Sequence, residues 1–143
     1  MFNSEKAKEI INNQQSMDMT VINRVKENLA KKGIILDQSA EIDNYLISRG
    51  KEAITFSDGT IALHTKVSAS GFYEELIHYG QIKSGRTILG NDENNLLMEI
   101  EAKEKLIKYR NSYNITDYEI VILTETLNEY IMELEKLKKE GDI

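Results

Sequence analysis

The sequence predicts a single, mostly helical α+β domain with one small β-hairpin. Two runs rich in strand-forming residues, at 53–56 and 60–64, flank Ser57-Asp58-Gly59, and Asp-Gly between such runs is a strong hairpin signal. Segments on both sides of this hairpin carry apolar residues at helical spacing. A chain of 143 residues with 41% hydrophobic content is enough for one modest core. Helices, a small sheet and further helices together make an α+β arrangement.

The N-terminal part, residues 1–50, is expected to be mainly helical. Its elements are a short polar helix, a longer amphipathic helix, a short apolar run and a capped helix, at residues 4–13, 18–32, 34–36 and 39–49. Gly33 and Gly50 follow the two longer helices, as expected for residues that end a helix in a left-handed conformation.

Three helices are expected after the hairpin. They lie around Glu74, at about 93–111 and at about 117–139, with a glycine-bearing loop at 84–90 after the first. Thr116 and Glu119 have the spacing of a capping box, which predicts the start of the last helix.

Composition excludes several classes of protein. There is no cysteine, so the chain has neither a disulfide framework nor a thiolate ligand or nucleophile. The formal net charge of −6 and the lack of a basic stripe argue against nucleic-acid binding. No apolar run approaches the length of a membrane span, and the N-terminus lacks the hydrophobic core of a Sec signal. We therefore expect a cytoplasmic protein with no membrane partner, acting in its own cell or in a host or target cell.

The most informative segment of the chain is residues 74–81. It contains Glu-Glu-x-x-His, which is the H-E-x-x-H helix of zinc peptidases with Glu74 in place of the first histidine. Glu74 and His78 share one helix face, so both can reach one ion, and Glu75 lies where such enzymes hold the general base. The helix is otherwise apolar nearly all round, so its polar stripe needs buried partners, and a metal is one way to supply them. The alternative is a glutamate pair on the helix surface with a histidine that forms an ordinary hydrogen bond or lies half-exposed.

A third ligand has to come from outside this helix, and Glu99 and Glu101 are the candidates. At roughly 100° per residue, the apolar residues between Leu96 and Tyr109 spread about a face centred near Glu99, whereas Glu101 points to the far side. A carboxylate within an apolar face is costly unless it is paired or bound to metal, which favours Glu99. The alternative for Glu99 is an ion pair with Lys103, one turn further along.

Together, Glu74-Glu75-x-x-His78-x-x-Gln81 and Glu99-Ile100-Glu101-Ala102-Lys103 resemble the zincin-like metallopeptidase domains of bacterial polymorphic toxins and phage proteins. They are also similar to minimal gluzincins, in which a Glu-x-x-Ala segment supplies the third ligand. The resemblance covers roughly residues 52–112, the core of one domain over 1–143, with residues 113–143 as a C-terminal helix. It implies a minimal zincin-like fold in which a short sheet lies beside the active-site helix.

Carried over residue by residue, the resemblance makes Glu75 the catalytic base and Glu74, His78 and Glu99 the metal ligands. Glu74 departs from the usual histidine at its position, and Gln81 would orient His78 or Glu74 from outside the ligand set. The implied cofactor is zinc, and the oxygen-rich ligand set also suits manganese or iron. The implied function is a metal-dependent peptidase, acting as a toxin-like or phage-associated effector on a protein or peptide, with an immunity or host protein as a partner.

The same resemblance gives expectations for the cleft around the site. Water activated by Glu75 would attack an amide carbonyl, and strand 60–64 would line the cleft and pair with an extended peptide. His64 is expected to be a surface residue at the end of that strand. A tyrosine would donate to the oxyanion, and the candidates are Tyr73, Tyr79 and Tyr109.

Two other classes compete with the hydrolase. The first is a zincin-like scaffold without activity that serves as a protein-binding phage or mobile-element accessory factor, with the charged helical segment 133–140 as an exposed arm. That segment is equally typical of a solvated terminal helix. The second is a di-iron carboxylate bundle, for which Glu75-x-x-His78 supplies one of the two Glu-x-x-His motifs needed.

Overall fold

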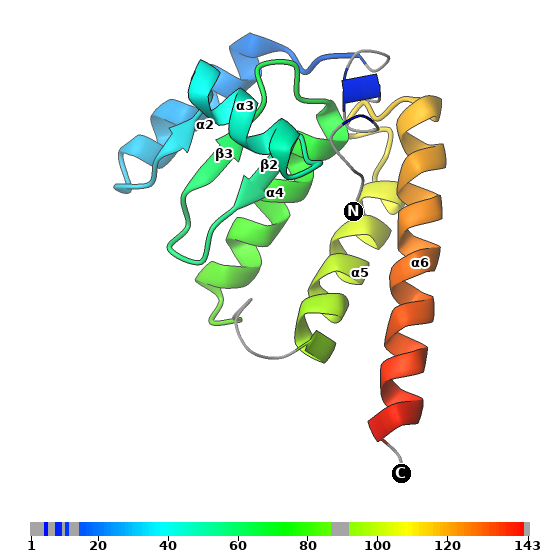
Figure 1. The fold of residues 1–143 in the computed structure, drawn as a ribbon. Coiled ribbons are helices and arrows are strands. Elements are labelled where there is room, and N and C mark those ends of the chain that lie inside the picture. Colours follow the sequence, from blue (N-terminus) through cyan, green and yellow to red (C-terminus); the bar gives the residue numbers. More distant parts are fainter. Residues whose placement is uncertain (1–4, 6–7, 10, 12–14, 87–91, 142–143) are drawn as a thin grey trace.

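Figure 1 shows the computed structural model, which describes residues 5, 8–9, 11, 15–86 and 92–141. The helices are α2 (Met19–Ala30), α3 (Ala40–Ser48), α4 (Ala69–Lys83), α5 (Asp92–Lys108) and α6 (Asp117–Gly141), and the strands are β1 (Leu36–Asp37), β2 (Ala53–Thr55) and β3 (Ile61–Leu63). The predicted mostly helical α+β fold is confirmed. The helix expected at 4–13 falls largely outside the described residues, as do residues 87–90 of the expected loop. Across the described part, no helix has the length and apolar character needed to cross a membrane.

The three strands form one small sheet in the order β1-β3-β2. β2 and β3 are antiparallel, with Ala53 opposite Leu63, so the predicted hairpin is confirmed. Its turn closes where the Gly59 N–H donates to the Phe56 carbonyl at 2.9 Å. Gly59 adopts a φ of +94°, a conformation that glycine takes without steric cost and that other residues rarely adopt.

The central position of β3 overturns one expectation. Its two edges are paired with β1 and β2, so the strand predicted at 60–64 has no free edge for an extended peptide. The sequence did not reveal this pairing because β1 is only two residues long, which is too short to show an alternating pattern. β2 ends the sheet order and is therefore the edge strand next to α4.

α4 is the central helix of the fold. It packs against β2 and β3 and also against α5, and α5 runs antiparallel to α6 beside it (Figure 1). Between α2, the sheet and α4 lies a hydrophobic cluster that includes Ile22, Leu36, Ile61, Leu63, Val67 and Phe72. A second cluster joins α4 to the C-terminal helices through Ala69, Leu106, Ile115 and Leu123. With apolar partners on both sides, α4 buries side chains on more than one face.

One buried side chain ties the start of α6 to the start of α4. Thr116 and Glu119 form the predicted capping box: the Glu119 N–H donates to Thr116 Oγ1 at 3.2 Å, and the Thr116 N–H donates to Glu119 Oε2 at 2.8 Å. Glu119 Oε1 also accepts hydrogen bonds from the N–H and the hydroxyl of Ser70, each at 2.9 Å. Because Ser70 lies in the first turn of α4, this carboxylate sets the relation between the two helices.

Glu119→Ala is expected to lower the free energy of unfolding by about 2–4 kcal/mol, because it leaves buried donors at two helix starts without an acceptor. Urea denaturation followed by circular dichroism measures the change. Glu125→Ala removes an exposed glutamate from the same helix and is the matched control, with an expected change within about 0.5 kcal/mol. Equal stability of the two variants would contradict the role of Glu119.

Candidate metal centre

The fold turns the polar stripe of α4 inward. Glu75, His78 and Gln81 are buried and Glu74 is partly buried, as the apolar pattern of this helix predicts. Glu74, Glu75 and His78 each offer one ligand atom, and these three atoms lie within 4.8 Å of one another. The two glutamates are therefore not a surface pair, but His78 does form an ordinary hydrogen bond, to Gln81, as the alternative allowed. This spacing is short enough for all three side chains to reach one ion.

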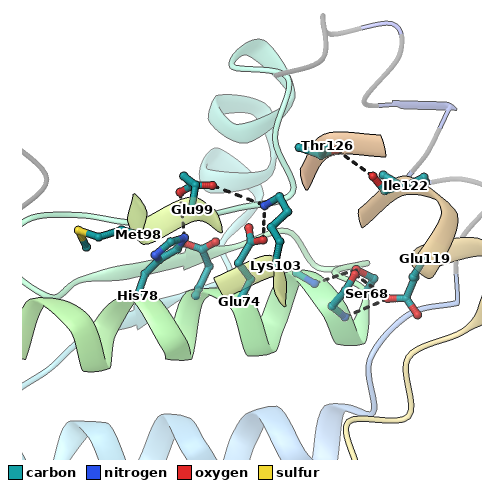
Figure 2. A network of polar contacts seen from close by, with 12 residues as sticks. Ser68, Glu74, His78, Met98, Glu99, Lys103, Glu119, Ile122 and Thr126 are labelled. Carbon is teal, nitrogen blue, oxygen red and sulfur yellow. Dashed lines mark hydrogen bonds and ion pairs between the residues drawn. The ribbon is translucent and has the colours of Figure 1, made fainter. Parts of the chain in front are cut away.

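α5 brings Glu99 to the same cluster and leaves Glu101 outside it. Glu99 Oε1 lies 2.9 Å from His78 Nε2, and Glu99 Oε2 lies 3.5 Å from Lys103 Nζ (Figure 2). Glu101 is exposed and forms an ion pair with Arg86 at 2.7 Å. The expected separation of the two glutamates to opposite sides of the helix is therefore found.

Lys103 connects the two helices through its ammonium group. Besides Glu99, it forms an ion pair with Glu74 of α4, so the ammonium lies between two of the carboxylates of the cluster (Figure 2). Lys103 is only 6% exposed. The ion pair of Glu99 with Lys103, expected as the alternative to metal binding, is thus present together with the contact to His78.

Gln81 fixes the orientation and the tautomer of His78. The Gln81 amide nitrogen donates to the Met98 carbonyl at 3.1 Å, so its oxygen faces His78 Nδ1 at 2.7 Å. That oxygen can only accept, which places a proton on Nδ1 and turns Nε2 toward the carboxylates. Nε2 is buried and forms an ion pair with Glu99 Oε1 at 2.9 Å, which is its close polar contact among the described residues.

Thr55 of β2 contacts Glu75 from the sheet side. Its hydroxyl lies 2.9 Å from Glu75 Oε1 and 3.0 Å from the Glu75 carbonyl oxygen. A hydroxyl has one proton to donate, so when it donates to the carbonyl its oxygen can accept a hydrogen bond from a neutral Glu75 carboxyl. Thr55 can therefore bind Glu75 in either protonation state.

The electrostatics of the cluster follow from burial and from close charges. Burial raises the pKa of the Glu75 carboxyl to about 7; His78 opposes this rise, and Glu74 and Glu99 add to it. Burial lowers the pKa of His78, but Glu99, Glu75 and Glu74 outweigh burial and raise this pKa to about 9. Burial raises the pKa of Glu99, yet His78 and Lys103 hold it below its usual range. The carboxyls of Glu75 and Glu99 thus lie in the same cluster with pKa values shifted in opposite directions.

A cavity of about 330 Å³ opens beside the cluster. Its polar wall includes Glu74, Glu75, Glu99 and Lys103, and α6 closes it with Ile122, Leu123, Thr126 and Tyr130. Glu52 and Ala53, at the start of β2, form part of a third side. The carboxylates of the cluster therefore face a space large enough for part of a substrate, whereas His78 is not among the residues that line it.

The tyrosine in this cavity is Tyr130, which the sequence analysis did not single out. Its ring centroid lies 5.4 Å from Lys103 Nζ, and burial, followed by Glu99, raises its pKa to about 12. The three expected tyrosines lie elsewhere: Tyr73 stacks on Tyr113, Tyr79 packs against the core, and Tyr109 is exposed. Helical spacing places Tyr130 on the side of α6 that carries Leu123 and Leu134, but spacing does not reveal which helix that side meets.

His64 is a structural residue rather than a surface one. It is partly buried, its Nδ1 accepts from the Lys66 N–H at 3.0 Å, and its Nε2 lies 3.8 Å from Asp43 of α3. The expectation of a surface position is wrong because α3 covers the end of β3.

Comparisons with protein families, with curated proteins and with solved structures find no match to this chain.

Proposed function

We propose that Glu74, His78 and Glu99 bind one divalent cation and that the protein is a metal-dependent hydrolase with Glu75 as its general base. The observation that carries this proposal is the state of His78. Its Nε2 is buried, lies 2.9 Å from Glu99 Oε1 and belongs to a group with Glu74 and Glu75 that could hold an ion, while Gln81 holds Nδ1. The pKa of about 9 keeps this imidazole protonated at neutral pH, so a cation would bind Nε2 in exchange for its proton, on a ring that Gln81 already orients.

The donor set fits a borderline cation. One imidazole nitrogen and two carboxylates suit zinc, and their oxygen-rich character also suits manganese or iron. Two carboxylates and one imidazole leave a bound ion less net positive charge than two imidazoles and one carboxylate. When bound, the ion would supply Lewis-acid polarisation of water and of the scissile carbonyl.

Glu75 has the properties of a general base in this reaction. Its pKa of about 7 places it near the operating pH, where a base accepts and releases a proton most effectively. Thr55 holds Oε1 of Glu75 at 2.9 Å and so leaves the other carboxylate oxygen for the attacking water. Glu75 would take the proton of that water and pass it to the leaving amine.

A peptide is the substrate class that the surroundings favour. β2 is an edge strand, and its first residue, Ala53, lines the cavity, so an extended peptide can pair with β2 in place of the strand first expected. The resemblance described above supports the biological setting: a toxin-like or phage-associated effector that acts on a host or target-cell protein and has an immunity or host protein as a partner.

One observation favours a second candidate, a catalytically inactive scaffold that binds proteins as a phage or mobile-element accessory factor. Lys103 pairs with both Glu74 and Glu99, so the buried carboxylates already have a cation from the chain itself. In this candidate the cluster is an ion-pair network that joins α4 to α5, and no metal is needed.

Metal content distinguishes the two candidates. Protein purified without tag or chelator is expected to hold about one zinc, manganese or iron ion per chain, measured by inductively coupled plasma mass spectrometry. His78→Ala should lose the ion, whereas His64→Ala, which removes the other histidine of the sequence, should keep it. If the native protein holds no ion and takes up neither Zn²⁺ nor Mn²⁺ on titration, the cluster is the ion-pair network of the scaffold.

A further inference from the structure

Lys103 controls which carboxylate oxygens of the cluster are available to an ion. Its ammonium bonds to Oε1 of Glu74 and lies 3.5 Å from Oε2 of Glu99. The other oxygen of Glu99, Oε1, faces His78 Nε2 at 2.9 Å. The two oxygens of the Glu99 carboxylate therefore have different partners, one the imidazole and the other the ammonium.

The packing keeps the ammonium beside these oxygens. Lys103 is 6% exposed, and the Tyr130 ring of α6 covers its ammonium at 5.4 Å from Nζ to the ring centroid. Glu99 and Lys103 lie one turn apart on α5, which holds their side chains on one face of the helix. An ammonium with so little exposure depends on these carboxylates to offset the cost of its burial, so it remains part of the cluster.

Divalent cations differ in what they need from carboxylates. Calcium takes six to eight oxygen ligands and commonly uses both oxygens of one carboxylate. Zinc takes four ligands and accepts single oxygens together with imidazole nitrogen. With Lys103 in place, neither carboxylate can offer both oxygens to an ion: Glu74 has one oxygen left, and the remaining oxygen of Glu99 is the one that faces His78. The ammonium also lowers the negative charge around the ion.

We propose that Lys103 determines the cation specificity of this site, because it restricts Glu74 and Glu99 to one oxygen each and so selects zinc-like ions against calcium. This inference rests on the proposed metal site and adds a role for a residue that the hydrolase mechanism does not use. Lys103 is a positioning residue here, since it acts through the two carboxylates and not on a substrate.

The test compares the affinities for Zn²⁺, Mn²⁺ and Ca²⁺ by competition titration, in the native protein and in Lys103→Met. Methionine has a similar length and no charge, so it frees both carboxylate oxygens without emptying the space. The ratio of calcium affinity to zinc affinity is expected to rise at least tenfold. Lys105→Met removes the same charge from an exposed position on α5 and should leave this ratio unchanged.

Two results would overturn the inference while leaving the metal site intact. If zinc and calcium affinity rise by the same factor in Lys103→Met, Lys103 acts through charge alone. If the variant binds no ion while the native protein does, Lys103 is required to hold the ligands in place. Circular dichroism checks that the variant is folded, and Lys103→Gln, which keeps a polar side chain, replaces it in the titration if it is not. If no protein binds any of the three ions, both the metal site and its specificity are overturned.

Discussion

Glu75→Gln is expected to lower kcat for peptide hydrolysis by about 10³-fold, within the range that a general base contributes, while the chain keeps its metal ion. The amide has the size of the carboxyl and still bonds to Thr55, but it cannot accept a proton from water. Hydrolysis of fluorescein-labelled casein and metal content by mass spectrometry are measured on the same preparation, because the prediction is that activity is lost while the metal ion is kept.

Glu101→Gln makes the same chemical change at an exposed position on α5 and should leave both quantities as they are. Any other result for Glu75→Gln would change the role assigned to Glu75. If the metal is lost together with the activity, Glu75 is a ligand, in line with its place beside Glu74 and His78, where the three ligand atoms lie within 4.8 Å of one another. If activity is retained, the base has to be sought elsewhere in the cavity.

Zinc affinity is expected to increase about 100-fold between pH 6 and pH 8, because binding displaces one proton and each pH unit then changes the affinity about tenfold. The proton comes from His78, whose pKa of about 9 keeps the imidazole protonated through this whole range. The sign follows directly: a higher pH lowers the concentration of the competing proton and so strengthens binding. Ionisation of Glu75, with a pKa of about 7, adds negative charge beside the ion and steepens the increase near neutral pH.

Competition with a chromophoric zinc indicator at pH 6, 7 and 8, with the indicator calibrated at each pH, measures this dependence. Gln81→Leu is an informative partner variant because it removes the acceptor from Nδ1 of His78. It should weaken zinc binding by about tenfold at every pH, which is at the lower end of the effect of such supporting contacts. An affinity of the native protein that does not change with pH would show that His78 gives up no proton on binding.

The sequence predicted those parts of the site that depend on position along a single helix. Helical spacing placed Glu75, His78 and Gln81 on one stripe, and the apolar surroundings predicted its burial. The same reasoning separated Glu99 from Glu101, which the structure places at the cluster and in an exposed ion pair respectively. The helix caps and the hairpin turn could be predicted equally well, since their sequence signals are nearby residues at fixed spacing.

Contacts between distant elements were not predictable in this way. The parallel pairing of β1 with β3 depends on two residues, Leu36 and Asp37, that carry no pattern of their own. Tyr130 enters the cavity because α6 packs antiparallel against α5. Neither the hydrophobic periodicity of α6 nor its composition specifies that packing partner. An ion pair of Lys103 with Glu99 was the alternative to metal binding, and helical spacing made it visible. The second partner of Lys103, Glu74, is on another helix, and only the packing of α4 against α5 brings it near.

Gln81 spans the boundary between two helices, since it bonds to an imidazole on α4 and to the backbone of Met98 on α5. The orientation of the His78 ring therefore depends on the distance between α4 and α5, because Gln81 is bonded to both. Small shifts in helix packing would turn the ring away from the carboxylates long before the chain unfolds. A change in the packing of α4 against α5 would then weaken metal binding through His78 while the fold is kept.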